Sequence, residues 1–216
     1  MHMINIERFQ CNMLGENCYV ANDETNECII VDCGAWFEEE RQAVTDYIKE
    51  NQFVPRHLLV THGHADHNLG NDTIKKTFGL APEICSADSI LMTGLREQAE
   101  QMFNISIDIA DYPDFKALNM DEQILFGSHK IDILPTPGHT PGGVCFYCRE
   151  EGLLFSGDTL FKGSIGRTDF PGGSMFAIIQ SLRALAQLPD SVTVLPGHGE
   201  QTTIGYELAT NPYMDR

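Results

Sequence analysis

The feature that most constrains this chain is the run Thr-His-Gly-His-Ala-Asp-His at residues 61–67. It follows the apolar stretch 58–60, which reads as a buried strand that ends in a turn. Imidazole and carboxylate groups are common ligands of transition metals, and such a density of them at a strand end seldom serves packing. We therefore expect a fold that presents this turn as a metal-binding loop at the edge of a sheet.

Three further turns carry candidate ligands, and each of them follows an apolar run. His139 lies in Pro-Gly-His-Thr, Asp158 in Ser-Gly-Asp-Thr, and His198 in Pro-Gly-His-Gly. Glycine-rich turns at strand ends are typical places for a rigid scaffold to hold functional side chains. These turns are therefore expected to meet the 61–67 loop at one edge of the sheets.

The candidate ligands sort into two metal sites. The first would be held by His62, His64 and His139. The second would be held by Asp66, His67 and His198, with Asp158 bridging the two sites through its two carboxylate oxygens. Two ions roughly 3.5–4 Å apart can share a water and make it a hydroxide near neutral pH. The donor set contains nitrogen and oxygen but no sulfur, which suits Zn, Fe or Mn.

Charge and cysteine content narrow the functional classes. The chain of 216 residues has 14 basic and 31 acidic side chains and a net charge of −17, which argues against nucleic acid and anionic membranes as partners. No apolar run approaches the roughly 18 residues of a membrane helix, and residues 1–5 show no secretory signal. The odd count of seven cysteines favours reduced thiols. We expect a soluble cytoplasmic protein that is a monomer or a small homo-oligomer.

The order of expected strands and helices predicts an α/β fold. Helices are expected at 36–52, 68–78, 89–103, 174–188 and 206–210, and the apolar face of the fourth would comprise Met175, Phe176, Ile179, Leu182, Leu185 and Leu188. Strands are expected at 4–9, 18–21, 28–31, 58–60, 84–85, 124–126, 131–134, 144–148, 153–155 and 192–195. This pattern favours one domain, 1–216, in which two sheets pack face to face with helices outside.

Two local segments leave alternatives open. Cys145 and Cys148 have the spacing of a redox or metal motif, but on a strand their side chains would point to opposite faces and pack as small apolar groups. The segment 92–115 is apolar and irregular, so it is either a packed excursion or a lid over the site.

Taken in order, the HxHxDH run and the three later turns resemble the metallo-β-lactamase-like hydrolase superfamily over most of the chain. The resemblance implies an αββα four-layer sandwich of two mixed β-sheets flanked by helices, with the metal site at one edge. It also implies the ligand roles given above. Asp32, in Ile-Val-Asp-Cys-Gly, matches a family turn near the metals and is expected to support the ligands from behind.

Within the superfamily, the segment 157–167 resembles glyoxalase II, which hydrolyses S-acylglutathione thioesters. In that family the position of Arg167 holds a basic residue that binds the glutathione tail, and an arginine can grip a carboxylate with two hydrogen bonds. The common zinc β-lactamases have a cysteine where this chain has Asp158. The sequence ends soon after His198, without the helical extension of the longer enzymes, so it resembles the short glyoxalase II-like branch.

The resemblance therefore predicts a binuclear metallohydrolase that acts on a small thioester, such as a glutathione conjugate, with a metal-bridging hydroxide as nucleophile. His64, Asp66 and Asp158 are the expected catalytic residues, and Arg167 the substrate-binding one. Two divalent ions are expected, Zn first, with Fe or Mn as alternatives. A mononuclear iron persulfide dioxygenase stays open, because 166–170 is also similar to that family. A lactonase on the same metal site and a non-enzymatic binding protein are the remaining alternatives.

Overall fold

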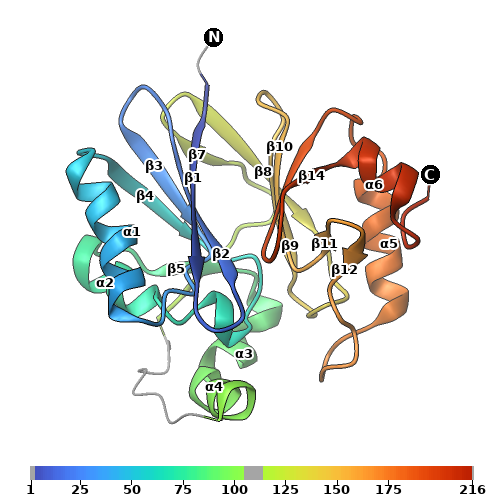
Figure 1. Cartoon of the computed structure of the whole chain (residues 1–216), viewed down its shortest axis with the longest axis horizontal. Helices are drawn as coiled ribbons and strands as arrows, with labels where there is room; N and C mark the ends of the chain where they lie inside the picture. The colour runs from blue at the N-terminus through green and yellow to red at the C-terminus, as the bar shows by residue number, and fades with distance from the viewer. Residues whose placement is uncertain (1–2, 105–113, 216) are drawn as a thin grey trace.

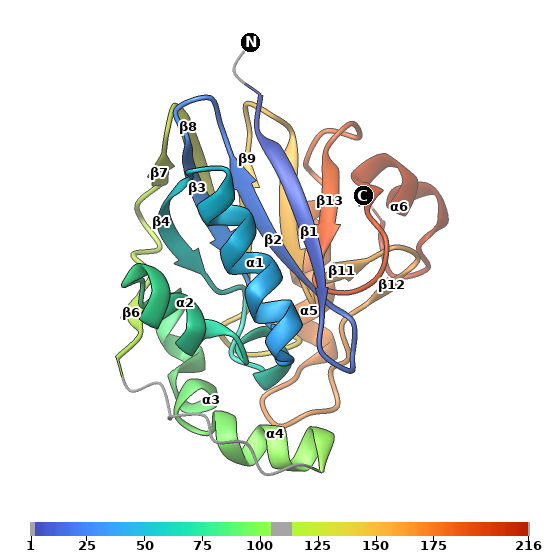
Figure 2. The same cartoon turned by 60° about the vertical axis from the view of Figure 1, so that its left-hand side comes forward.

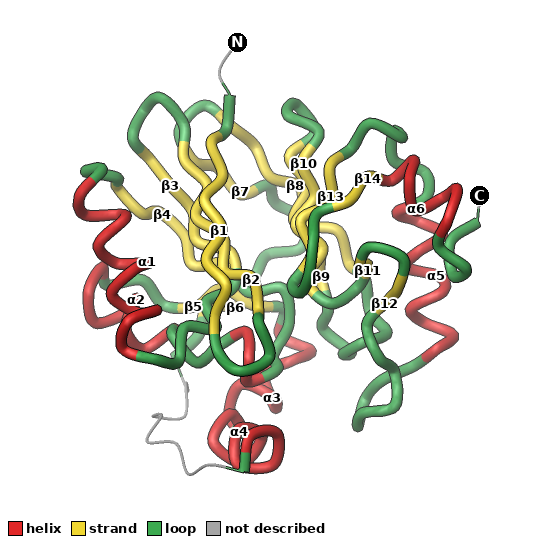
Figure 3. The backbone as a smooth tube through the Cα atoms, in the orientation of Figure 1, coloured by secondary structure: helices red, strands yellow, loops and turns green. Residues whose placement is uncertain are grey.

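The computed structural model describes residues 3–104 and 114–215, and it has the predicted α/β sandwich. Within these residues, two six-stranded sheets pack face to face, and helices cover the outer face of each sheet (Figure 1). Figure 3 shows the strands of both sheets in yellow between the outer helices in red. The expected four-layer architecture is therefore confirmed.

The first sheet is antiparallel on one side and parallel on the other. Its order is β1 (Asn5–Cys11), β2 (Glu16–Asn22), β3 (Glu27–Val31), β4 (Val54–Leu59), β5 (Pro82–Ile84) and β6 (Lys116–Ala117). β1 to β3 pair antiparallel, whereas β3 to β6 pair parallel. The parallel strands bring their carboxyl ends, and the loops that follow them, to the same edge of the sheet.

The second sheet has a parallel pair among antiparallel neighbours. Its order is β14 (Thr202–Thr203), β13 (Thr193–Pro196), β10 (Leu153–Gly157), β9 (Val144–Cys148), β8 (His129–Pro135) and β7 (Ile124–Phe126). Only β10 and β13 pair parallel, so their carboxyl ends share an edge as well. A small hairpin, β11 (Leu160–Phe161) with β12 (Ser164–Ile165), extends from the end of β10.

The helices connect the strands and cover the sheets. α1 (Glu38–Glu50) and α2 (Asn71–Phe78) lie over the first sheet, and α5 (Met175–Leu185) and α6 (Ile204–Thr210) lie over the second (Figure 1). α3 (Ser89–Thr93) and α4 (Leu95–Phe103) lie beyond the edge of the sandwich (Figure 2). In the described part of the chain, no helix is long and apolar enough to cross a membrane.

The core between the sheets follows from the alternation of side chains along each strand. Phe146 and Cys148 of β9 join the cluster between the two sheets, together with Phe126 and Phe155. Cys145, on the opposite face of β9, packs in the cluster that contains the buried residues of α5. The prediction that the two thiols point to opposite faces is therefore confirmed. All seven cysteines lie in the described residues, and all are free.

Two helix predictions were wrong in detail. Met175 and Phe176 are 50% and 78% exposed, because the buried face of α5 runs instead through Ile178, Ser181, Leu182 and Leu185. The helix predicted at 89–103 is two helices, which meet at Gly94. Glycine is a weak helix former, so the break falls at this residue.

The segment 92–115, for which a packed excursion and a lid were the two alternatives, includes residues 105–113, which lie outside the described residues. The described part is a packed element. Met92, Leu95 and Ala99 are buried against Val60 and Ala65 of the 60–67 loop. This apolar packing restricts the movement of the histidine-rich 61–67 loop.

We expect Phe146→Ala to lower the free energy of unfolding by about 3–5 kcal/mol, because it leaves a cavity between the two sheets that neighbours fill only partly. Phe176→Ala is the matched control, since its side chain is 78% exposed, and it should change stability by less than about 0.5 kcal/mol. Urea unfolding followed by circular dichroism measures both. Equal effects of the two substitutions would contradict this account of the core.

Candidate metal centre

Strand ends bring all seven predicted ligands to one edge of the sandwich. The loop after β4 carries His62, His64, Asp66 and His67, and the loop after β8 carries His139. Asp158 follows β10 and His198 follows β13. Ligands from both sheets therefore face each other across the gap between the sheet edges, as the order of the motifs predicts.

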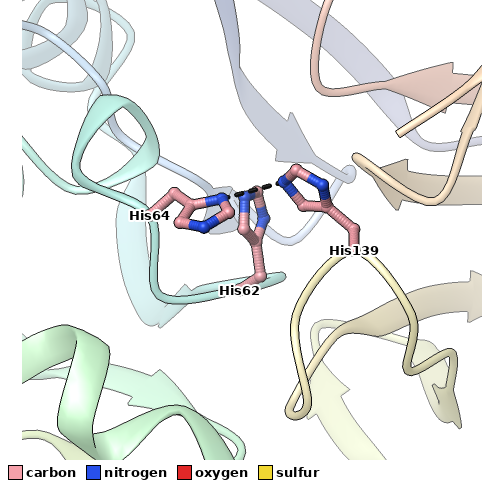
Figure 4. Close-up of side chains that lie close together, drawn as sticks. All are labelled: His62, His64 and His139. Carbon is pink, nitrogen blue, oxygen red and sulfur yellow. Dashed lines mark hydrogen bonds between the residues drawn. The ribbon is translucent and has the colours of Figure 1, made fainter. Parts of the chain in front are cut away.

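The first predicted group is assembled from two loops. His62 and His64 come from the loop after β4, and His139 comes from the opposite loop (Figure 4). The donor atoms of the three side chains lie within 4.8 Å of one another, and His64 Nδ1 is 2.8 Å from His139 Nε2. The rings stand edge to face, at interplanar angles of 74–89°. Three imidazole nitrogens thus point at a common centre.

The second predicted group lies beside the first. The donor atoms of Asp66, His67 and His198 also lie within 4.8 Å of one another. His198 Nε2 is 3.2 Å from Asp66 Oδ2 and 3.3 Å from His67 Nε2. Asp158 lies between the groups, because Oδ1 is 3.3 Å from His67 Nε2 and Oδ2 is 3.5 Å from His139 Nε2. This is the place that a bridging carboxylate requires.

Unpaired buried atoms show that the cluster fits a metal. His62 Nε2, Asp66 Oδ1 and Asp158 Oδ1 are buried and have no hydrogen-bond partner among the described residues. Each such atom costs about 1–3 kcal/mol relative to a hydrogen-bonded one, so a folded protein seldom gathers several in one place. Divalent ions offset this cost by accepting the lone pairs, and nitrogen and oxygen donors suit Zn, Fe or Mn.

The electrostatics of the cluster agree with this interpretation. Burial lowers the pKa of His62 well below its usual value and that of His64 to about 4, so both rings are neutral donors at pH 7. Burial opposes ionisation of Asp158, but the charge of His67 holds the pKa of Asp158 below its usual value. Burial likewise opposes protonation of His67, yet Asp158 and Asp66 raise its pKa well above the usual range. The carboxylates therefore favour a positive charge in the cluster, which a bound cation would supply while displacing the His67 proton.

Hydrogen bonds from behind fix the orientation of the ligands. Asp32, at the end of β3, accepts from the Thr61 amide (2.8 Å) and the Thr61 hydroxyl (2.8 Å) and lies 3.0 Å from His67 Nδ1. His139 Nδ1 donates to the carbonyl of Arg167 at 2.7 Å. These contacts occupy Nδ1 of His67 and of His139, so Nε2 of both rings faces the centre. The structure thus places Asp32 directly behind a predicted ligand.

Sequence reasoning missed Asp88, which joins the two ligand loops. This fully buried carboxylate accepts from the Gly63 amide at 2.9 Å, the Thr140 hydroxyl at 2.7 Å and the Gly142 amide at 2.6 Å. Gly63 lies between two ligands of the 61–67 loop, and Thr140 follows His139. In the sequence Asp88 reads as a turn residue before a helix, and no local signal reveals partners 25 and 54 residues away.

Glu16 was missed as well. Its carboxyl group is fully buried, accepts from the Gly34 amide at 3.0 Å, and lies 4.0 Å from His67 Nδ1. Burial raises its pKa well above the usual value. A Cβ on Gly34 would lie 2.0 Å from the Asp66 carbonyl, so only glycine allows this close approach of the backbone behind the ligands.

A cleft of about 330 Å³ opens over the ligands. Its lining includes predicted ligands and four apolar side chains, Leu14, Phe161, Ile165 and Phe170. A smaller cavity of about 140 Å³ adjoins it, and His64 and Phe170 line both. The space above the donor cluster is thus mainly apolar, which suits a small organic molecule.

Arg167 is the cation of this cleft, but its charge is already paired. Its guanidinium donates to both carboxylate oxygens of Asp169, at 2.7 and 2.6 Å. It also lies 3.9 Å from the ring centroid of Phe170, which holds it at the cleft wall. Arg167 therefore lines the cleft with its guanidinium already bound by Asp169, and its role in binding a substrate carboxylate stays a prediction.

We expect Asp88→Asn to loosen both ligand loops, because one carboxylate oxygen is replaced by an amide that cannot accept. Each buried donor left unpaired should cost about 1–3 kcal/mol of unfolding free energy. Asp121→Asn, at an exposed turn position, is the matched control. Urea unfolding and elemental analysis of bound metal measure the outcome. Wild-type stability and metal content in Asp88→Asn would show that the carboxylate does not join the loops.

Comparison with known proteins agrees with the fold and the ligand cluster. The chain is 36% identical over 217 residues to a hydroxyacylglutathione hydrolase, GloC, of Haemophilus influenzae, covering 98% of this chain and 99% of that protein. A solved structure of the B3 metallo-β-lactamase BLEG-1 superposes with a TM-score of 0.88 at 30% identity, covering 97% of this chain and 99% of the other. A di-iron-bound form of TTHA1623 superposes with a TM-score of 0.84 at 32% identity, covering 96% and 100%.

The family model of the metallo-β-lactamase superfamily matches residues 12–198, a range that contains all seven ligands predicted from the sequence. Fold, order of motifs and relatives agree: this chain belongs to the metallo-β-lactamase superfamily.

Proposed function

We propose that this protein is a binuclear metal-dependent thioester hydrolase of the hydroxyacylglutathione hydrolase type. The observation that carries the proposal is the arrangement of two donor groups, joined by Asp158, on the floor of a cleft with apolar walls and one arginine. The Haemophilus influenzae relative named as a hydroxyacylglutathione hydrolase supports this substrate class. We further infer that residues 1–216 act as one catalytic domain, because both sheets contribute ligands.

The ligand assignment follows the geometry. His62, His64 and His139 would hold one ion, and Asp66, His67 and His198 the other, with Asp158 shared between them. When bound, the ions supply Lewis acidity and lower the pKa of a coordinated water towards neutrality. Zinc is the metal that we propose first, and the di-iron form of a similar structure makes iron the alternative.

The remaining chemistry belongs to side chains of the cleft. Asp66 keeps Oδ2 against His198 and leaves Oδ1 without a hydrogen-bond partner, so Oδ1 can orient the attacking water and accept its proton. Phe161 and Phe170 limit the access of bulk water to the acyl group. The thiolate that leaves is a weak base, so its departure does not require a strong general acid.

Substrate binding is assigned to Arg167. Its guanidinium lies at the cleft wall and can grip a carboxylate with two parallel hydrogen bonds. A substrate carboxylate must first displace Asp169, which already occupies that fork. The binding free energy that Arg167 contributes is therefore the difference between its contact with the substrate carboxylate and its contact with Asp169.

We expect His64→Ala and Asp158→Ala to lower the rate of S-lactoylglutathione hydrolysis at least about a hundredfold, because each removes a donor of the centre. Loss of thioester absorbance, elemental analysis and circular dichroism measure rate, metal content and folding. His57→Asn is the control, since His57 lies outside the centre and contacts Glu83 instead. Full activity in either ligand variant would overturn the metal assignment.

We expect opposite effects from the two members of the cleft ion pair. Arg167→Ala should raise KM for an acidic thioester about tenfold with little change in kcat, because a contact equal in ground and transition state is lost. Asp169→Asn should lower KM, because the guanidinium is released for the substrate. Steady-state kinetics on an acidic and a neutral thioester measure both. If KM is unchanged in both variants, Arg167 does not contact the substrate.

Metal content and oxygen uptake separate the hydrolase from the iron alternative. About two ions per chain whose retention requires the seven predicted ligands, together with thioester hydrolysis, support the proposal. A single iron per chain, with oxygen consumed in the presence of a persulfide, would replace it by a dioxygenase. A lactone and a β-lactam complete the substrate panel, since a similar structure is described as a B3 metallo-β-lactamase.

A further inference from the structure

A second group of metal-ligand side chains lies at the other end of the sandwich. The β2–β3 turn carries Asp23 and Glu24, and the β7–β8 turn leads into His129. Figures 1 and 2 show these two turns side by side, at the end of the strands remote from α3 and α4. The turns belong to different sheets, so any contact between them joins the two sheets at this edge.

His129 is the unusual member of this group. Its side chain is buried, with 3% of the residue exposed, and neither ring nitrogen has a hydrogen-bond partner among the described residues. Nε2 points towards the acidic turn and lies 3.7 Å from Asp23 Oδ2. Buried imidazole nitrogens are normally hydrogen-bonded. The ring of His129 therefore has a nitrogen lone pair that is free to bind a metal ion.

The two carboxylates are held in place around this ring. Asp23 Oδ2 accepts from the Ser128 amide at 2.9 Å, and Asp23 Oδ1 accepts from the Thr25 amide at 3.0 Å. The Ser128 hydroxyl lies 3.3 Å from Asp23 Oδ2 and 3.5 Å from Glu24 Oε1, between the two acidic groups. Burial acts to raise the pKa of Asp23, but these hydrogen bonds lower it, so the carboxylate is ionised at neutral pH. Such support from behind is typical of ligating carboxylates.

We propose that Asp23, Glu24 and His129 form a further site for a divalent transition-metal ion of the zinc type. Their donor atoms lie within 4.8 Å of one another, which small rotations of the side chains can close around an ion. One imidazole and two carboxylates form a nitrogen and oxygen set, which favours zinc over calcium or magnesium. The net charge of −17 favours the association of any cation.

This ion is separate from those of the catalytic centre. His129 begins β8, whereas His139 follows its other end. A strand of seven residues spans roughly 20 Å, so one ion cannot serve both places. The role of the site is structural, because the ion would link the β2–β3 turn of one sheet to the β7–β8 turn of the other. It therefore stabilises the folded chain without touching the substrate cleft.

Zinc content of the full chain tests the proposal. The protein is loaded with zinc, freed of excess by gel filtration, and analysed for zinc per chain. We expect His129→Asn to hold one zinc fewer per chain than wild type, with an unchanged rate of thioester hydrolysis. His57→Asn is the matched control, because His57 already has Glu83 and the Leu125 carbonyl as partners, and it should keep the wild-type zinc content.

A second variant covers the case in which His129→Asn does not fold. Glu24→Gln alters an exposed side chain, and it should weaken zinc binding at this site about tenfold in competition with a chelator. Zinc should also raise Tm by about 3–5 °C less in Glu24→Gln than in wild type, because a tenfold weaker affinity lowers the stabilisation by about 1.4 kcal/mol. Wild-type zinc content and affinity in both variants would overturn the proposal. These readouts do not depend on whether the protein hydrolyses thioesters.

Discussion

The catalytic centre depends on holding loops of two different sheets at a fixed separation, and buried carboxylates do most of this work. Asp88 receives hydrogen bonds from the 61–67 loop and from the loop that carries His139. Asp32 fixes the end of the 61–67 loop and the ring of His67 at once. Because these carboxylates are buried, each hydrogen bond has a defined direction, and breaking one costs free energy. The apolar core holds the two sheets rigidly together, and the hydrogen bonds to these carboxylates fix the ligand loops on them.

Burial of these ligand atoms away from water costs free energy, and a bound cation would offset that cost. The neutral rings of His62 and His64 lie beside the ionised Asp158, and hydrogen bonds from behind hold His67 and His139 so that their other ring nitrogens face the centre. Without a cation, a proton on His67 partly offsets the negative charge. Stability and metal binding are therefore linked, since an ion that binds only the folded state adds its binding free energy to the stability of the fold.

The sequence was sufficient to predict the sandwich and the seven residues of the centre, because strand-end motifs and alternation are local signals. The seven residues gather as expected, although their roles as ligands stay a prediction. Contacts between distant segments could not be predicted: Asp88 has partners far along the chain, and the two-residue strands such as β6 depend on pairing with a neighbour. The exposed Phe176 was misplaced because a spacing pattern does not show where the covering sheet ends. The pair of Arg167 with Asp169 is local, but either residue alone also reads as a surface charge.

That pair has a consequence for how substrates arrive. Among the described residues that line the cleft, Arg167 is the single arginine, and Asp169 cancels its charge at long range. The chain around it carries a net charge of −17, so its long-range field repels an anionic substrate. Arg167 then attracts a substrate carboxylate only at short range, when that carboxylate replaces Asp169 on the guanidinium. Dissolved salt would screen the repulsion and speed the encounter, which is the opposite of what electrostatic steering produces.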